Sequence, residues 1–188
     1  MKKNLKTFKN HNKTVLTVIF ICFTTFFQGC KSSSTAYDES VSDNIIKELT
    51  NTLLDNWHKA AANASFESYF SLMDQNAIFI GTDAAEHWTK EEFKTYSKPY
   101  FDKGKAWSFT TIDRHIFISK DKKIVWFDEL LNTQMGICRG SGVLTLGNDT
   151  WKITHYTLSM TIPNKLVEDV VSLKKEKDTI LLKQILSD

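Results

Sequence analysis

Residues Cys138 to Pro163 constrain the fold more than any other segment of the chain. Two runs rich in β-branched and aromatic residues flank Gly147-Asn148-Asp149, which is the local signature of an antiparallel hairpin with a tight turn. A two-stranded ribbon is marginally stable on its own, so we expect the rest of the domain to pack onto it. The sequence therefore predicts a domain built around an antiparallel sheet.

A histidine stands among apolar residues on the second strand of this hairpin. Because side chains alternate along a strand, Trp151, Ile153 and His155 are expected on one face and Tyr156 on the other. An imidazole on such a face either serves a ligand or a reaction, or is a core histidine satisfied by one donor and one acceptor. The sequence leaves both interpretations of His155 open.

The first 29 residues predict a secretory signal peptide. Five lysines and no acid precede Cys30, and an apolar run from Val15 to Phe27 leads into Gln28-Gly29-Cys30. This run is short for a bilayer-spanning helix. The remaining length and the 41% hydrophobic content suit one globular domain with appendages.

The cysteine at this break resembles that of a bacterial lipoprotein signal. The resemblance implies cleavage before Cys30, a lipid on its thiol, and a flexible tether over residues 30–41. We then expect an exported protein of the cell envelope, lipid-anchored to a bacterial membrane on its periplasmic side. An ordinary signal peptide cleaved nearby, or an N-terminal anchor, is the alternative.

Charge and cysteine content limit the classes of partner, metal and cofactor that we expect this protein to bind. The whole-chain charge of +2 includes the five lysines before Cys30, so the rest of the chain carries −3. No Lys/Arg cluster or basic aromatic stripe remains, and nucleic acid is not expected as a partner. Cys138 is the only cysteine after Cys30, so no disulfide framework or metal quartet can be built, and neither a metal nor a cofactor is expected.

Helices are predicted before the hairpin. An apolar stripe at helical spacing runs through the segment from Ser42 to Ala64. A shorter helix is expected after Ser65, and Thr89 opens a third helix with a capping-box sequence. The residues of the first stripe are Ile45, Leu49, Leu53, Trp57, Ala60 and Ala64.

Turns and breaks between these helices are also predicted. A brief strand is expected over Ala77 to Gly81, and Asp83 and Glu86 have the spacing of a helix cap. Pro99 is expected to bend or end the third helix, because proline lacks a backbone donor, and Gly104 to follow its end.

Two more strands are predicted between the helices and the hairpin. Trp107 to Ser119 and Ile124 to Leu131 alternate on either side of a polar turn. On the second of them Asp128 and Glu129 point to opposite faces, so one carboxylate faces inward, and periodicity leaves open which. Residues 164–188 predict an amphipathic helix packed on the domain.

This α+β order resembles the SnoaL-like branch of the nuclear transport factor 2-like superfamily over residues 42–163. It implies a cone, in which a strongly bent antiparallel sheet wraps around the N-terminal helices and encloses a pocket, and homodimers that pair through the outer sheet surface. The resemblance rests on Trp57, Phe79-Ile80-Gly81-Thr82-Asp83 with Trp88, Trp126-Phe127-Asp128-Glu129-Leu130, Arg139-Gly140-Ser141-Gly142, and Trp151-Lys152-Ile153 before His155 and Ser159.

Two functional hypotheses follow, because this fold hosts both binding modules and enzymes. The first is an aromatic-lined pocket that binds a small, partly apolar molecule. Its candidate ligand-binding residues are Trp57, Tyr69, Trp88, Trp126 and Arg139. Arg139 either clamps a carboxylate of the ligand or forms an internal salt bridge.

The second hypothesis is a cofactor-independent isomerase, dehydratase or cyclase. In ketosteroid isomerases of this superfamily a carboxylate base works with neutral donors in an apolar cavity. The corresponding candidates here are Asp83, Asp128 or Glu129 as the base and His155 as its partner.

Overall fold

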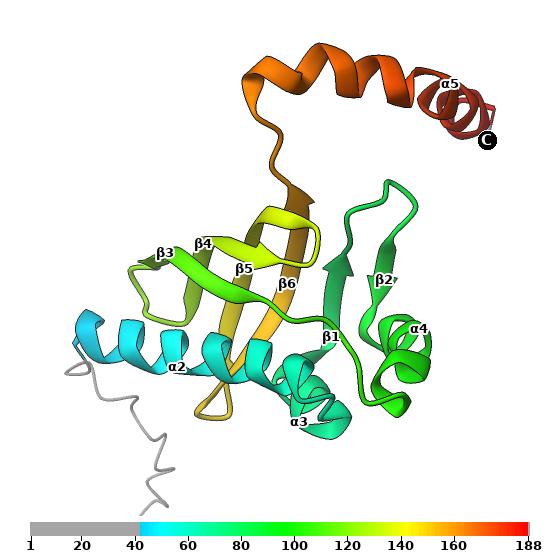
Figure 1. The fold of residues 1–188 in the computed structure, drawn as a ribbon. Coiled ribbons are helices and arrows are strands. Elements are labelled where there is room, and N and C mark those ends of the chain that lie inside the picture. Colours follow the sequence, from blue (N-terminus) through cyan, green and yellow to red (C-terminus); the bar gives the residue numbers. More distant parts are fainter. Residues whose placement is uncertain (1–41, 188) are drawn as a thin grey trace, which may run out of the picture. The chain divides into compact units, whose positions relative to one another are not determined.

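The computed structural model describes residues 42–187 (Figure 1). The predicted signal peptide, the tether and Cys30 lie outside the described residues. The elements are, in order, α2 (Asp43–Ala62), α3 (Phe66–Ser71), β1 (Met73–Ile80), β2 (His87–Thr89), α4 (Lys90–Asp102), β3 (Thr110–Ile118), β4 (Ile124–Thr133), β5 (Gly136–Gly147), β6 (Thr150–Met160), the 3₁₀ turn η1 (Asn164–Leu166) and α5 (Val167–Ile185).

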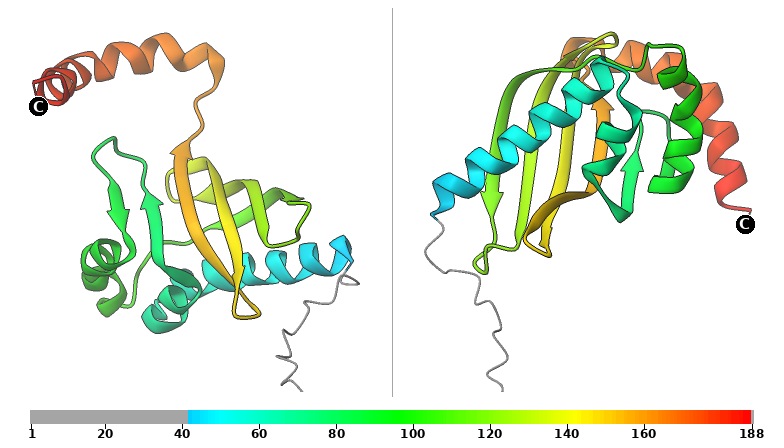
Figure 2. Two further views of the ribbon diagram at one scale, coloured as in Figure 1. Left: turned by 180° about the vertical axis from the view of Figure 1, so that it is seen from behind. Right: turned by 90° about the horizontal axis from the view of Figure 1, so that it is seen from below.

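The six strands form one bent, unclosed sheet in the order β2-β1-β6-β5-β4-β3. β1 runs parallel to β6, and every other neighbouring pair is antiparallel. Figures 1 and 2 show the sheet curving around α2, which crosses its inner face, while α3 and α4 lie beside β1 and β2. This arrangement confirms the predicted α+β fold with a cone-shaped sheet.

The β5–β6 hairpin has the predicted tight turn. Asn148 and Asp149 both have positive φ, 48° and 58°, which is the geometry of a type I′ turn and matches the twist of the strands. Asn and Asp tolerate this left-handed backbone better than other residues with a side chain. The turn therefore sets the register that pairs Gly147 with Thr150.

A β-bulge in β6 changes the predicted faces of that strand. Val143 pairs with His155 and Leu144 with Ile153, so Thr154 is an extra residue in β6. Ile153 is buried before the bulge and Tyr156 after it. His155 therefore lies on the face opposite Ile153, and the prediction that they share one was wrong.

The buried stripe of α2 is also displaced from the predicted one. Ile45 and Leu49 are 49% and 53% exposed, whereas Ile46 and Thr50 are fully buried. Thr50 can face the core because its hydroxyl donates a hydrogen bond to the Ile46 carbonyl at 2.7 Å. The buried side of α2 consists of Ile46, Thr50, Leu54, Trp57, His58, Ala60 and Ala61.

The segment after β1 is a hairpin loop rather than the start of a helix. The Asp83 carboxylate accepts from the Ala85 backbone N–H at 2.9 Å, and Glu86 Oε2 accepts from the Asp83 N–H at 3.2 Å. These bonds stabilise a loop that leads into β2, so the predicted helix cap at Asp83 was wrong. The capping box at Thr89 is present and begins α4.

Gly104 follows the end of α4 as predicted, whereas Pro99 does not end the helix. Pro99 lies inside the helix, which continues to Asp102, and Gly104 follows with φ +69°. Only glycine adopts this conformation without strain. The chain then turns back toward β3.

The predicted C-terminal helix is present as η1 and α5, but no residue of either is buried. The expected packing of this helix on the domain is therefore not found. Within residues 42–187 no helix is both long enough and apolar enough to cross a membrane.

Candidate functional site

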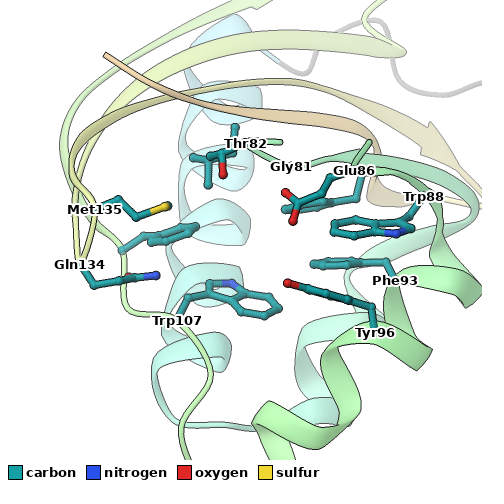
Figure 3. Close-up of a pocket in the computed structure, with 12 residues that line it drawn as sticks. Gly81, Thr82, Glu86, Trp88, Phe93, Tyr96, Trp107, Gln134 and Met135 are labelled. Carbon is teal, nitrogen blue, oxygen red and sulfur yellow. The ribbon is translucent and has the colours of Figure 1, made fainter. Parts of the chain in front are cut away.

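A cavity of about 160 Å³ opens between the β1–β2 hairpin, α4 and the β4–β5 turn (Figure 3). Side chains from both ends of the domain sequence meet here because the bent sheet brings β6 and the β4–β5 turn beside β1. The residues that line it are Phe79, Gly81, Thr82, Glu86, Trp88, Phe93, Tyr96, Trp107, Phe109, Gln134, Met135 and Leu158.

Half of the residues that line the cavity are aromatic. Phe93 stacks on Phe79 with ring centroids 3.9 Å apart, and Trp88 stacks on Tyr96 at 4.5 Å. Trp107 lies 5.5 Å from Phe93, at an angle of 25° between the ring planes. Rings fixed by mutual stacking present a preformed apolar surface to a ligand.

Glu86 is the only ionisable acid or base among the cavity-lining residues apart from the Tyr96 phenol. Figure 3 shows its carboxylate and the Tyr96 hydroxyl pointing into the space between the rings. A Cβ at Gly81 would collide with the Glu86 side chain, so the glycine leaves the room that this orientation needs. Burial and then a hydrogen bond with Tyr100 raise the pKa of Tyr96, which keeps its hydroxyl protonated and able to donate.

A buried polar cluster lies deeper in the cone, around Glu129. Glu129 Oε1 accepts hydrogen bonds from His58 Nε2 at 2.9 Å and from the Tyr156 hydroxyl at 3.0 Å. Its Oε2 accepts from Arg114 Nε at 2.9 Å and contacts Nη2 of the same guanidinium at 2.8 Å. Glu129 is fully buried, and both oxygens of its carboxylate accept hydrogen bonds from protein side chains.

Arg114 ties this cluster to α2. Its Nη1 donates to Asp55 Oδ1 at 2.8 Å and to Asn51 Oδ1 at 3.2 Å. The side chain is only 4% exposed, and it reaches from β3 across the inner face of the sheet to the helix. The guanidinium thus links β3, β4 and α2 through one planar group.

Opposing effects set the pKa values in this cluster. Burial alone would raise the pKa of Glu129, but the hydrogen bond and charge of His58, together with Arg114, outweigh it and lower the pKa. Burial and then the Glu129 charge raise the pKa of Tyr156 well above its usual value. At neutral pH Glu129 is ionised and Tyr156 is a neutral donor.

One layer of rings separates the cavity from this cluster. Phe79 and Phe109 line the cavity, and their ring centroids lie 5.6 Å from Tyr156 and 5.8 Å from His58 respectively. None of the residues bonded to Glu129 lines the cavity. The cluster therefore packs behind the rings of the cavity wall and does not itself face the cavity.

The predicted ligand-binding residues divide into three groups. Trp88 lines the cavity. Trp57 and Tyr69 are buried and stack on each other at 4.9 Å in the aromatic core behind it. Trp126 and Arg139 are exposed on the outer face of the sheet.

The predicted catalytic residues do not come together. Asp128 and His155 lie on the outer face, where Asp128 is 3.3 Å from His115. Asp83 lies in the exposed β1–β2 loop. Glu129 is the inward carboxylate of the Asp128/Glu129 pair, but it belongs to the buried cluster.

Several residues of the cavity wall and of the buried cluster were not predicted as site residues from the sequence. They are Glu86, Tyr96 and Trp107 in the wall, and Arg114, His58 and Tyr156 in the cluster. The aromatic face of α4, with Phe93 and Tyr96 three residues apart, was a usable signal for the cavity wall. No local signal pairs Arg114 with Glu129, because their contact depends on the register between β3 and β4.

The described residues contain no group of three His, Cys, Asp or Glu side chains placed to hold a metal ion. A buried aromatic cluster beside an open cavity fits either a ligand-binding or an enzymatic role. The cavity is therefore the candidate site.

Solved structures share this fold. An NTF2-like protein from Cytophaga hutchinsonii ATCC 33406 is 20% identical, with a TM-score of 0.52 over 61% of this chain and 98% of that chain. An NTF2-like protein from Pseudomonas putida KT2440 is 10% identical, with a TM-score of 0.56 over 66% and 92%. A domain with a cystatin-like fold from Nostoc punctiforme PCC 73102 is 14% identical, with a TM-score of 0.57 over 78% and 100%. At these identities the matches establish the fold alone.

The sequence itself identifies the family. No curated protein matches the chain. Residues 50–163, which run from within α2 to the end of the sheet, match the SnoaL-like domain. Since this match spans more than half of the chain, the protein belongs to the SnoaL-like domain family.

Proposed function

We propose that this SnoaL-like domain binds a small, partly apolar molecule in the cavity beside Trp88. The observation that carries the proposal is the composition of the wall, which combines preformed aromatic faces with a single carboxylate, Glu86. Apolar walls supply affinity and a few convergent polar groups supply orientation in small-molecule sites.

The same wall indicates which ligands it favours. Neither lysine nor arginine lines the cavity, so an anionic ligand would meet the Glu86 carboxylate without a compensating charge. The faces of Trp88, Phe93 and Trp107 carry negative potential that attracts cations. We propose an aromatic or alicyclic molecule that presents an ammonium group or another hydrogen-bond donor to Glu86.

Three probes of similar shape and different charge test this proposal. Benzylammonium, benzyl alcohol and benzoate are titrated into the full chain, and binding is followed by tryptophan fluorescence. Benzylammonium should bind most tightly and benzoate least. Glu86→Gln should remove the preference for the cation, whereas Glu67→Gln, an exposed glutamate on α3, should keep it.

A pair of tryptophan variants supplies the second control. Trp88→Ala should weaken binding roughly tenfold, which corresponds to about 1.4 kcal/mol, because it removes one wall of the cavity. Trp126→Ala removes an exposed tryptophan of the outer face and should leave the affinity unchanged. Tightest binding of benzoate, or equal effects of the two substitutions, would refute the proposal.

None of the predicted catalytic residues favours the proton-transfer alternative. Asp83, Asp128, Glu129 and His155 all lie outside the cavity wall. Glu129 already accepts bonds from three side chains, and its lowered pKa makes it a weak base. Binding is therefore the function that the cavity supports best.

We also propose that the chain is exported and held at a bacterial membrane by a lipid on Cys30, with the domain on the periplasmic side. The five lysines and the apolar run before Cys30 support this proposal. Cys30→Ala should move the protein from the membrane fraction to the soluble fraction, while Cys22→Ala should not. A chain that stays with the membrane after Cys30→Ala would contradict lipid anchoring.

We further propose that the protein forms a homodimer that pairs through the outer face of the sheet. Phe117 and Trp126 are 44% and 46% exposed on this face, and their rings stack at 5.8 Å. Exposed aromatic residues of this kind are typical anchors of protein interfaces. In a chain without η1 and α5, which bury no residue, Trp126→Asp should lower the mass of the protein in sedimentation, and an unchanged mass would argue against this interface.

A further inference from the structure

The C-terminal helix α5 presents apolar side chains that nothing in the described chain covers. None of its residues is buried, and Val171, Leu182 and Ile185 are 60%, 56% and 60% exposed. A helix gains most of its stability from packing one face against a partner. We therefore expect a partner surface to cover the exposed apolar side of α5.

Six positions along one side of α5 are arranged symmetrically about Glu176. Val167 lies nine residues before Glu176 and Ile185 nine residues after it. Val171 and Leu181 each lie five residues from it. These six residues of α5 follow one another at spacings of four, three, four, three and four, which places them on one side of the helix, as in a coiled coil. We call this row of residues the seam; it consists of Val167, Val171, Lys174, Asp178, Leu181 and Ile185.

The symmetry extends to charge and to the flanks of the seam. Lys174 and Asp178 each lie two residues from Glu176 and carry opposite charges. Leu166 and Val170 at one end correspond to Leu186 and Leu182 at the other. An antiparallel copy of α5 centred on Glu176 would thus meet apolar residues with apolar residues and a cation with an anion.

We propose that α5 pairs antiparallel with α5 of a second copy of this chain. The two-fold axis passes beside Glu176, so each Lys174 faces Asp178 of the other copy, and the same surface serves both copies. A parallel pair would place Lys174 against Lys174 and Asp178 against Asp178. The charges at the centre of the seam therefore select the antiparallel arrangement.

Charge composition favours a second copy over a membrane surface. Helices that lie on membranes carry an excess of Lys and Arg on the polar side. From Val167 to Ile185 the helix has four lysines and four acidic residues, and its net charge is zero. Two of these charges lie in the middle of the apolar side, where a lipid surface would offer them no partner.

Pairing along the whole seam requires α5 to straighten. Figure 1 shows the second half of α5 turned away from the direction of the first. The Thr179 hydroxyl donates a hydrogen bond to the Lys175 carbonyl at 2.7 Å, a contact that is associated with helix bending. The free energy gained by burying the seam against a second copy would compensate for the cost of straightening the helix.

Sedimentation of full-chain variants tests the proposal, with Trp126→Asp present throughout so that the outer face of the sheet does not contribute. Lys174→Asp makes both central positions of the seam negative, and Asp178→Lys makes both positive. Each should weaken self-association at least tenfold. An equimolar mixture of the two variants should associate again, because opposite charges then meet between chains.

The mixture separates pairing from helix stability. Lys174 and Asp178 also form an ion pair within the helix at 3.3 Å, and both variants lose it equally. Recovery in the mixture can therefore arise only between chains. Failure of the mixture to associate, or an unchanged mass in the single variants, would overturn the proposal.

A cysteine pair tests the direction of pairing. In a chain with Val171→Cys and Leu181→Cys, oxidation should link position 171 of one copy to position 181 of the other. Peptide mapping that found 171 linked to 171 would overturn the antiparallel arrangement. This experiment involves neither Glu86 nor the cavity, so its result is independent of the proposed ligand.

Discussion

At the scale of single residues, the environment of Glu129 shows how a buried carboxylate is accommodated in the cone. Burying a carboxylate costs several kcal/mol unless charge and hydrogen bonds compensate it. His58 and Tyr156 bond one oxygen, and Arg114 bonds the other. Such a cluster specifies one arrangement of α2 on the sheet, because any other leaves a buried charge unpaired.

Replacement of His58 should therefore destabilise the fold. His58→Ala removes one donor to Glu129 and leaves a space in the core, so we expect the free energy of unfolding to fall by about 3 kcal/mol. Urea unfolding at pH 7 measures it. His115→Ala, on an exposed histidine that also contacts carboxylates, is the matched control and should change stability by less than about 0.5 kcal/mol. Equal losses of unfolding free energy in the two variants would show that the buried His58–Glu129 pair stabilises the fold no more than an exposed pair does.

The stability contributed by Glu129 should be lost in acid. Its pKa in the folded state is lowered from the ordinary value of 4.5, so the unfolded state binds the proton more readily. This contribution is complete above pH 4.5 and declines as the pH falls through the folded-state pKa. Glu129→Gln should cost roughly 3 kcal/mol at pH 7, because Arg114 loses its buried charged partner and keeps only the exposed Asp55.

The test compares wild type and Glu129→Gln by urea unfolding between pH 7 and pH 3. The difference in their free energies of unfolding should shrink as the pH falls below 4.5. A difference that stays constant over this range would contradict a lowered pKa for Glu129.

At the scale of elements, local patterns predicted the helices and all strands except β2, but not their buried faces. The hairpin turn at Asn148 and the capping box at Thr89 are local features, and the structure contains both. The bulge at Thr154 depends on pairing with β5, and it reverses the side on which His155 lies. The rotated stripe of α2 depends on Glu129, a distant residue that makes it favourable to bury His58.

The close approach of β5 to the cluster gives a prediction for Gly140. A Cβ at this position would collide with the Tyr156 hydroxyl and lie 3.0 Å from Glu129 Oε1. Gly140→Ala should therefore cost about 2 kcal/mol of unfolding free energy, as overpacked cores do. Ser141→Ala, on the exposed side of the same strand, should stay within about 0.5 kcal/mol. Thermal unfolding followed by circular dichroism compares them, and a neutral Gly140→Ala would mean that Tyr156 can move aside.

At the scale of the whole molecule, the order of elements predicted an α+β fold and the resemblance to SnoaL-like domains predicted the cone, but neither predicted the composition of its cavity. The cavity wall combines residues from β1, β2, α4 and β6 with three connecting segments. Which side chains meet there depends on how far the sheet bends and where α4 ends. Trp88 was predicted because it follows a recognisable motif, whereas Glu86 resembled a helix cap.

The cone should fold without α5. Because η1 and α5 bury no residue, deletion of residues 164–188 should leave the packing of the domain intact. We expect the melting temperature of the sheet domain to change by less than about 2 °C, which corresponds to a free-energy change below about 1 kcal/mol. Benzylammonium binding should also persist, since the cavity wall ends at Leu158. Scanning calorimetry at low protein concentration makes the comparison. A melting temperature lowered by 10 °C would show that α5 packs on the domain after all, and would leave its apolar side without need of a second copy.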